Sequence, residues 1–448
     1  MVSTCDDWSL PDMRKASPTT RQRALRRARI LLRRRGWTAA VWRRRVAIMG
    51  GAILVGLAAI SFAWTADRAT QWFDQVVEQC WWSPLVMTPM GYALTVWLTN
   101  RLAPAARGSG IPQIIAAKRD PANATADLAS ARTAVFKAAL TAIALAVGGS
   151  VGREGPTVQL GATIMAYAHK WLRVPINASV LVAGAAAGVA AAFNTPLAGV
   201  AFAIEELAAA YEQRMTLLVM TAVLIAGMIA QGVAGDYVYF GIVGETLPLR
   251  TVLIVAPIAG GLGGLGGGLF ARMTLWFARG GARRISGGRP LIFAACSGLV
   301  VAMLGIATDT TWGTGYGAAR AIIEGDNASL WFGPAKLIST LVTAAAGLPG
   351  GIFAPSLATG AGLGNVLHAL FPAQPTGALV LLAMVGYFTG VVRAPLTAVI
   401  IMAEATGSRG LMLPLLATAL IAEAAAGLIC RERLYHGLSS GFLRPGST

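Results

Sequence analysis

The sequence predicts an all-α polytopic membrane protein, built from two related halves whose helices are repeatedly interrupted. Of its 448 residues, 55% are hydrophobic and only 13% are charged, whereas soluble domains have about 25% charged residues. Long stretches carry no charge, and two glycine–proline pentads recur at matching places in the apolar sequence. The low charge predicts membrane helices, and the recurrence predicts a duplicated bundle with interrupted helices.

The uncharged stretches have the length of membrane-crossing helices. No Asp, Glu, Lys or Arg lies between Lys336 and Arg393. A helix needs roughly 18–20 apolar residues to cross a bilayer. Four further uncharged runs approach or exceed that length: Val46–Ala66, Met215–Gly235, Thr251–Ala271 and Leu291–Thr308.

Positive charge is concentrated before the first apolar run. Residues 1–45 hold thirteen basic and three acidic residues, and so supply +10 (13 − 3) of the net charge of +17. The positive-inside rule predicts a cytoplasmic N-terminus, where the tail can rest on anionic lipid. The alternatives are nucleic-acid binding and a twin-arginine export signal at Arg44-Arg45. The span length of Val46–Ala66 opposes the signal, and we expect no nucleic-acid partner.

The chain is expected to divide into a tail, a membrane body and a short end. We predict a basic cytoplasmic tail at residues 1–45, a transmembrane domain at 46–430 and a short cytoplasmic C-terminus at 431–448. The two halves of the transmembrane domain are expected at roughly 46–245 and 246–430. Helices that stop inside the membrane need their terminal amides satisfied by protein, water or ligand. Several such ends meeting at one place would make an ion site.

The repeat can be followed residue by residue. The pentads GREGP (152–156) and GIFAP (351–355) lie 199 residues apart (351 − 152). Because both halves keep Glu205 and Glu404, we interpret these two acids as structural, with backbone amides as hydrogen-bond partners. The same offset joins three pairs: Gly161 with Gly360, Pro196-Leu197 with Pro395-Leu396, and Glu205 with Glu404.

Two acids break the repeat and are therefore functional candidates. Glu154 stands where the second half has Phe353, and Glu206 stands where it has Ala405. A carboxylate at a helix opening inside a membrane is costly, which makes Glu154 the first candidate. The alternative for Glu154 is a loop residue paired with Arg153. For Glu206 it is a salt-bridged helix end near the cytoplasm.

The pentads also have the composition of an anion site. GSGIP (108–112), like the two repeated pentads, places a proline near the start of a helix, where no backbone donor is lost. The glycines allow close approach of the backbone. The helix N-terminus then presents free N–H groups with about half a positive charge, and the lack of a buried cation allows release. Ser109 and Tyr435 can add hydroxyl donors; the alternatives are a helix cap and an interfacial aromatic.

Together these segments resemble the CLC family of chloride channels and chloride/proton exchangers, in the bacterial type without C-terminal CBS domains. GSGIP, GREGP, GIFAP and the late Tyr435 follow the family signature in order. FNTPLAG (193–199) followed by Glu205-Glu206 also matches, as does RAPLT (393–397) followed by Glu404. The resemblance implies an inverted-repeat bundle with many tilted and broken helices. It also implies a homodimer in the bacterial inner membrane, with both termini cytoplasmic.

The resemblance also implies roles for single residues. Glu154 matches the external gating glutamate, whose carboxylate competes with chloride and swings outward when it is protonated. Glu206 matches the internal proton-transfer glutamate of the exchangers. The implied chloride site consists of the amides of Ile352 and Phe353, the hydroxyls of Ser109 and Tyr435, and Gly155.

One stretch departs from the family pattern. Exchangers often carry acidic residues just after GSGIP, where this chain has Gln113 and Ile115. Lys137, which matches a buried lysine of the family, is therefore expected to lack its usual acidic neighbour. Serine at position 109 matches members that prefer chloride to nitrate.

We therefore predict a secondary active Cl⁻/H⁺ exchanger, with a passive voltage- or pH-gated chloride channel as the alternative. Chloride and protons are the expected ligands, and we expect no cofactor or metal because the four Cys and three His show no paired spacing. An intramembrane enzyme is the third interpretation, but Ser109 has no evident base. The sequence leaves open the direction of transport, the anion ranking and the dimer interface.

Overall fold

The computed structural model describes residues 39–207, 213–235, 240–326 and 328–443, which fold almost entirely into helices. Most of the predicted basic tail lies outside these residues; its last part, residues 39–45, opens the first described helix. The only β-type pairing among the described residues is a single bridge between Gly152 and Gly351. The fold is therefore all-α, as predicted.

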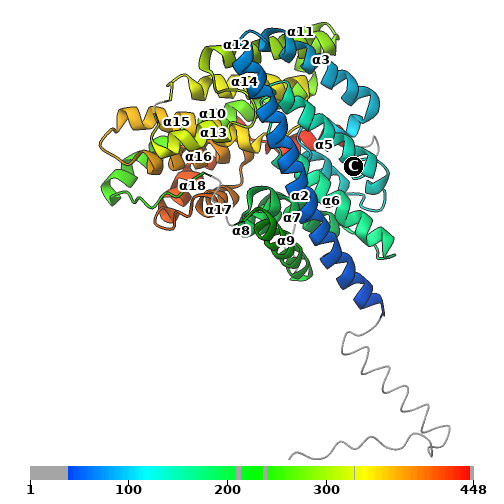
Figure 1. The fold of residues 1–448 in the computed structure, drawn as a ribbon. Coiled ribbons are helices and arrows are strands. Elements are labelled where there is room, and N and C mark those ends of the chain that lie inside the picture. The colour runs from blue at the N-terminus through cyan, green and yellow to red at the C-terminus, as the bar shows by residue number, and fades with distance from the viewer. Residues whose placement is uncertain (1–38, 208–212, 236–239, 327, 444–448) are drawn as a thin grey trace, which may run out of the picture.

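The helices follow one another through two halves of the chain (Figure 1). The first half contains α2 (Ala39–Gln79), α3 (Pro84–Leu102), α4 (Ile111–Ala117), α5 (Ala131–Ala146), α6 (Glu154–Trp171), α7 (Ala178–Phe193), α8 (Pro196–Phe202) with the π turn η3 (Ala203–Leu207), and α9 (Gln213–Ala234). The second contains α10 (Leu249–Trp276), α11 (Ala282–Ser286), α12 (Pro290–Thr308), α13 (Tyr316–Glu324), α14 (Phe332–Ala346), α15 (Phe353–Leu370), α16 (Thr376–Val392), α17 (Pro395–Thr406), α18 (Met412–Ile429) and α19 (Leu434–Ser439).

Full-length spans and short helices are mixed, as the interrupted apolar pattern predicts. Among the described residues, four helical segments are long and apolar enough to cross a membrane: Ala39–Gln79, Leu249–Ser286, Pro290–Thr308 and Met412–Ile429. In contrast, α8 has 7 residues and α17 has 12, too few for a span.

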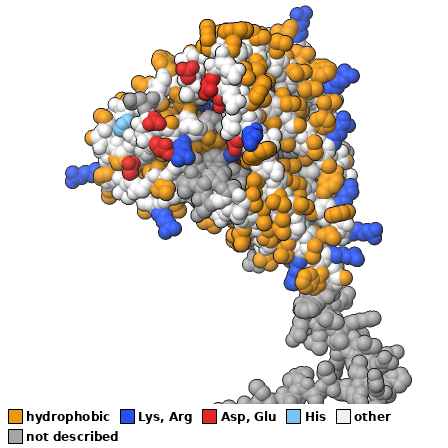
Figure 2. Space-filling model, in the orientation of Figure 1, with side chains coloured by type: hydrophobic (Ala, Val, Ile, Leu, Met, Phe, Trp, Pro, Cys, Tyr) orange, Lys and Arg blue, Asp and Glu red, His pale blue; other side chains and the backbone are white. Residues whose placement is uncertain are grey.

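The surface of the long helices suits contact with lipid. Trp64 and Trp72 on α2 are 60% and 51% exposed. Figure 2 shows hydrophobic side chains over much of the face on which α2 lies, with Lys and Arg at its edges. Apolar surface exposed on this scale would be unusual on a soluble protein, and it supports the prediction of a membrane protein.

The centre of each half is a helix buried on all sides. Every residue of α7 from Val180 onward is buried, and so is every residue of α16 from Gly377 onward; helices that are apolar all round need such a place. A Cβ at Gly161 of α6 would lie 2.3 Å from the Gly184 carbonyl oxygen, and one at Gly360 of α15 would lie 2.6 Å from Met384 Cα. The repeated glycines therefore allow α6 and α15 to approach these central helices.

The two halves meet through reciprocal contacts. Gly152 N donates to Gly351 O (2.7 Å), and Gly351 N donates to Gly152 O (2.6 Å). Glu404 of α17 accepts from Leu197 N and Ala198 N (3.2 and 2.9 Å) at the start of α8. Each carboxylate therefore caps the other helix, because Glu205 of η3 likewise accepts from Leu396 N and Thr397 N (3.0 and 2.7 Å). The predicted hydrogen bonds from backbone amides to Glu205 and Glu404 are confirmed.

We expect Glu404→Ala to lower the free energy of unfolding by about 1–2 kcal/mol, because two first-turn amides of α8 lose a charged acceptor. Thermal unfolding in detergent measures the change. The control is Glu324→Ala, which removes an exposed i,i+4 pair with Arg320 worth only a few tenths of a kcal/mol. Equal stability of the two variants would show that the α8 cap contributes nothing.

Candidate functional site

The site lies where two helix N-termini face each other. Glu154 is the first residue of α6 and Phe353 is the first residue of α15, and the Gly152–Gly351 bridge joins the loops that precede them. Pro156 and Pro355 occupy equivalent places in the first turns, where a proline costs no hydrogen bond. Both pentads therefore direct unpaired first-turn amides and partial positive charge toward a common point.

The carboxylate of Glu154 already occupies this point. The side chain is fully buried, and its Oε2 accepts a hydrogen bond from Ala354 N in the first turn of α15 (3.4 Å). Its Oε1 accepts a hydrogen bond from the hydroxyl of Tyr316. The implied amides were those of Ile352 and Phe353; the amide that donates to the carboxylate here belongs to the next residue.

Arg153 forms its ion pair with Asp67 of α2, although Glu154 is the next residue in the chain. Its Nη1 donates to Asp67 Oδ1 (2.7 Å) and to Ala63 O (3.0 Å), both on α2. Asp67 is 57% exposed, whereas Arg153 is only 5% exposed. The ion pair that the structure gives Arg153 is therefore with Asp67, and Glu154 is held by a hydroxyl and an amide.

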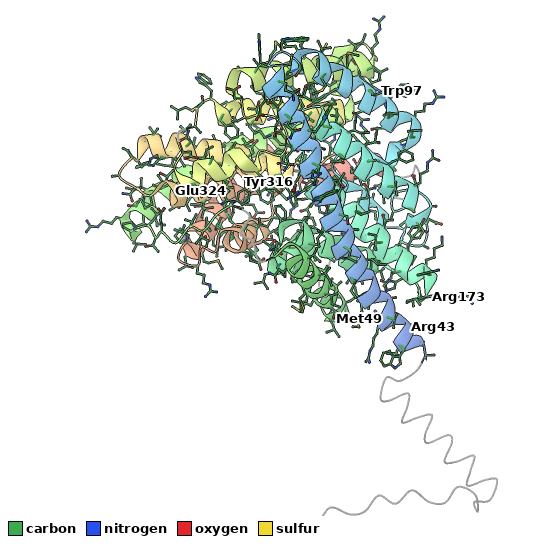
Figure 3. All side chains as sticks on the ribbon, in the orientation of Figure 1. Arg43, Met49, Trp97, Arg173, Tyr316 and Glu324 are labelled. Atoms are coloured by element: carbon green, nitrogen blue, oxygen red, sulfur yellow. The ribbon has the colours of Figure 1, made fainter. Side chains whose placement is uncertain are left out.

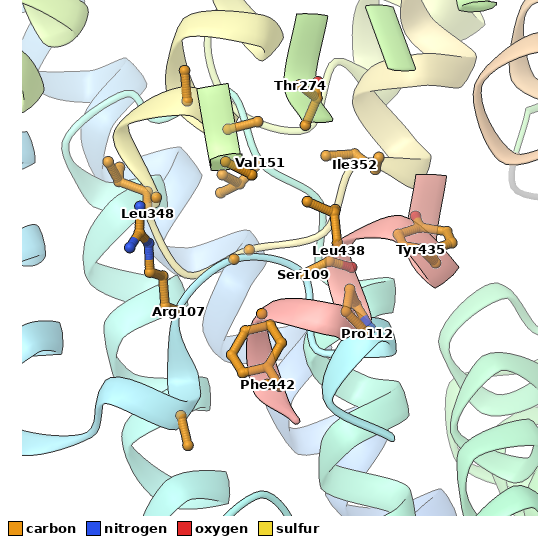
Figure 4. Close-up of a pocket in the computed structure, with 18 of the residues that line it drawn as sticks. Arg107, Ser109, Pro112, Val151, Thr274, Leu348, Ile352, Tyr435, Leu438 and Phe442 are labelled. Carbon is orange, nitrogen blue, oxygen red and sulfur yellow. The ribbon is translucent and has the colours of Figure 1, made fainter. Parts of the chain in front are cut away.

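Ser109 and Tyr435 line one cavity of about 690 Å³, together with Ile352 (Figure 4). Both hydroxyls are buried and lie close to each other, and neither makes a hydrogen bond of normal distance and angle to the described residues. Ser109 does not cap α4, whose N-cap is Gly110. Tyr435 is fully buried and so is not an interfacial aromatic. Two buried donors without partners are unusual and suit a ligand that accepts hydrogen bonds.

Gly155 connects the carboxylate to the cavity. A Cβ at this position would lie 2.5 Å from Ser109 Oγ and 3.0 Å from Gly351 Cα. Only glycine fits between the two loops here. Glu154 and Ser109 thus sit on either side of a single small residue.

Phe353 links the start of α15 to α19. Its ring is buried and contacts the ring of Tyr435 (centroids 5.9 Å apart). It also packs edge-on against Phe202 of α8 and Phe388 of α16, at 5.7 and 4.9 Å. These aromatic contacts fix Tyr435 beside the cavity.

Glu206 lies apart from Glu154, at the end of α8. It is buried in the π turn η3, and its Oε1 lies 3.3 Å from Nδ1 of His436 on α19. Neither carboxylate oxygen has a hydrogen bond among the described residues. His436 follows Tyr435 directly and its side chain is 42% exposed. The helix α19 therefore places Tyr435 in the cavity beside Ser109 and His436 beside Glu206. No pattern in the sequence marks His436 as a neighbour of Glu206.

Gln113, which departs from the family pattern, and Lys137, which matches it, organise the loop before α4. Gln113 Nε2 donates to Ala105 O and Arg107 O (3.1 and 2.6 Å), and its Oε1 accepts from Gly110 N (3.0 Å). Lys137 Nζ is buried and donates to the carbonyl oxygens of residues 106 and 108. No carboxylate lies within ion-pair distance of Lys137 among the described residues. Both side chains therefore hold the segment that presents Ser109.

Three solved structures share this fold. A slow cyanobacterial Cl⁻/H⁺ antiporter aligns with a TM-score of 0.79 at 24% identity, over 91% of this chain and 99% of the antiporter. A eukaryotic CLC transporter aligns at 0.73 and 21% identity, over 89% of this chain and 74% of that one. A CLC-type fluoride/proton antiporter aligns at 0.75 and 21% identity, over 88% and 98%.

The sequence comparison agrees with the fold. Residues 91–427 match the family model described as voltage gated chloride channel. The match spans well over half of the 448 residues and includes all three glycine–proline pentads. The chain therefore belongs to the voltage-gated chloride channel family, the CLC family.

Proposed function

We propose that this protein exchanges chloride for protons across a membrane, as a secondary active Cl⁻/H⁺ antiporter. The observation that carries the proposal is the position of the Glu154 carboxylate. It is buried at the N-terminus of α15 and accepts the Ala354 amide, in the place where free amides would otherwise hold an anion. A negative side chain and a chloride ion cannot both fill such a place at low cost.

The competition gives a mechanism for coupling. When Glu154 is ionised, its carboxylate occupies the amides and blocks chloride. When it takes up a proton, it loses the charge that the helix end favours, and chloride can replace it. The cavity at Ser109 and Tyr435 supplies hydroxyl donors on the other side of Gly155, so an ion that leaves the amides moves to a neighbouring anion site.

The inner proton route begins at Glu206 in this proposal. Its buried carboxylate lies beside His436, which is partly exposed. A titratable group at the surface next to a buried acid is suited to pass protons between water and the interior. Chloride and protons would thus share the outer gate at Glu154. On the inner side they would follow separate routes, chloride past Ser109 and Tyr435 and protons past Glu206.

A passive chloride channel is the second candidate, because the family model is described by that activity. The presence of both Glu154 and Glu206 favours exchange, since the resemblance associates an acid at the inner position with exchangers. We further propose a homodimer with one ion path in each subunit, in a bacterial inner membrane with both termini cytoplasmic. The basic residues before the first span support that orientation.

In liposomes loaded with chloride, we expect outward chloride flux through the wild-type protein to drive proton uptake. Glu154→Gln should keep chloride flux and abolish proton movement, because the side chain can no longer carry a proton. Glu206→Gln should also stop protons while sparing chloride. Parallel recordings with chloride and pH electrodes measure both fluxes. Chloride flux without proton movement in the wild type would favour the channel, and coupling retained in Glu154→Gln would exclude the proposed gate.

Crystals of the Glu154→Gln variant soaked in bromide should show anomalous density beside Ser109 Oγ and Tyr435 Oη. The two hydroxyls have no protein partner and lie in the same cavity. Ser109→Ala combined with Tyr435→Phe should lower the occupancy several-fold, because both donors are lost. An empty cavity, with bromide bound only at the protein surface, would contradict the assignment of this site.

A further inference from the structure

Tyr316 makes a contact that the family resemblance does not use. It is the first residue of α13 (Figure 3), and its hydroxyl donates a hydrogen bond to Glu154 Oε1. We propose that Tyr316 is a latch that positions the gating carboxylate. The hydrogen bond holds Glu154 against the N-terminus of α15, so that chloride has to displace a tethered side chain. This inference rests on the proposed competition between Glu154 and chloride.

The ring of Tyr316 is held from two directions. It packs against Phe240, with the centroids 5.4 Å apart. The guanidinium of Arg153 lies 5.8 Å from the ring centroid, within the range of a cation–π contact. Arg153 is itself fixed to α2 by Asp67. These contacts fix the Tyr316 ring so that its hydroxyl points to Glu154. They continue through Arg153 to Asp67, which is exposed at the surface.

The loop that carries Tyr316 is the second copy of the loop that carries Ser109. GTGYG (313–317) corresponds to GSGIP (108–112), with an offset of 205 (313 − 108). A buried lysine holds each copy. Lys137 donates to carbonyls of the first loop, and Lys336, 199 residues later (336 − 137), donates to Thr311 O and Gly313 O (2.9 and 2.8 Å) of the second.

The two copies present different side chains at equivalent places. Tyr316 stands where the first copy has Ile111 (316 − 111 = 205), and its own hydroxyl donates to the carboxylate of Glu154. Thr314 stands where the first copy has Ser109 (314 − 109 = 205), and its hydroxyl accepts from the backbone N–H of Tyr316 (3.5 Å). In the first copy the hydroxyl of Ser109 is left without a partner and lines the cavity. In this proposal the loop of Ser109 therefore supplies a hydroxyl to the anion, and the loop of Tyr316 supplies a hydroxyl to Glu154, the acid that competes with the anion.

The groups around the carboxylate show what the latch adds. Glu154 receives the Ala354 amide from α15 and the Tyr316 hydroxyl from α13, and the nearby Arg153 forms an ion pair with Asp67. A hydroxyl that donates to a carboxylate forms a charge-assisted hydrogen bond, which is stronger than a neutral one. Loss of this bond should weaken the competitor and leave the amides in place.

The test is chloride binding to the purified full-length protein, measured by isothermal titration calorimetry at neutral pH. Tyr316→Phe removes one oxygen atom and should tighten chloride binding about tenfold, the effect of losing a hydrogen bond to a charged group. The matched control is Tyr92→Phe, which removes a buried hydroxyl bonded to Thr343 at 2.7 Å. That control should bind chloride as the wild type does. Unchanged affinity in Tyr316→Phe would overturn the latch.

A double-mutant cycle separates a latch from a general structural role. Glu154→Ala should bind chloride more tightly than the wild type, and addition of Tyr316→Phe should then change nothing. The same change in both backgrounds would mean that Tyr316 acts on the fold, and the latch would be wrong. If Glu154→Ala itself leaves chloride binding and proton coupling unaltered, the proposed function fails; if only Tyr316→Phe is silent, the latch alone fails.

A second substitution keeps the hydroxyl of residue 316 and changes only its strength as a hydrogen-bond donor. Fluorinated tyrosine at position 316 has a more acidic hydroxyl and so donates a stronger hydrogen bond at a pH where the hydroxyl stays protonated. Chloride binding should weaken several-fold, opposite in sign to Tyr316→Phe. This arm decides the question if Tyr316→Phe does not fold, and tighter chloride binding here would also overturn the proposal.

Discussion

The structure depends on one constraint: helices that begin inside an apolar body leave their first amides without partners, and each needs an acceptor. At α8 and α17 the acceptors are Glu404 and Glu205, each supplied by the opposite half. At α15 the acceptor is the carboxylate of Glu154. The chemistry is the same, but Glu404 and Glu205 are matched by symmetry, whereas Glu154 has no counterpart acid. In the proposed exchange, this cap without a symmetric partner is the one that chloride replaces.

The buried cations have partners other than the anion. Lys137 and Lys336 donate to backbone carbonyls of two loops, and Arg153 is paired with Asp67. The cavity is also lined by Arg107, but an anion at the amides of α15 would meet dipoles and hydroxyls, with no direct ion pair. Such partners bind a halide loosely enough for it to leave. The two lysines thus hold the loops that carry Ser109 and Tyr316.

The sequence predicted those parts of the site that follow from local rules or from the repeat. Glycine and proline mark the starts of α4, α6 and α15, and the shared offset of 199 identified Glu205 and Glu404 as a pair. Tyr316 and His436 were missed, because their contacts join residues 162 apart in one case and 230 apart (436 − 206) in the other. Tyr316 also lies in a loop whose offset is 205, so alignment of the halves at 199 conceals its relation to GSGIP. Comparison of GSGIP with GTGYG was the available signal.

Under the proposed exchange, the unequal use of the two loop copies would let one scaffold handle both an anion and a proton. If both loops presented free hydroxyls, the site would hold chloride without regard to Glu154. If both hydroxyls were bonded to acids, no donors would remain for the ion. The structure has one of each: Ser109 is unpaired beside the cavity, and Tyr316 is bonded to the carboxylate. In the proposed mechanism the anion and the acid are bound by separate hydroxyls and compete only for the amides of α15, so that the occupancy of those amides would couple protonation of Glu154 to binding of chloride.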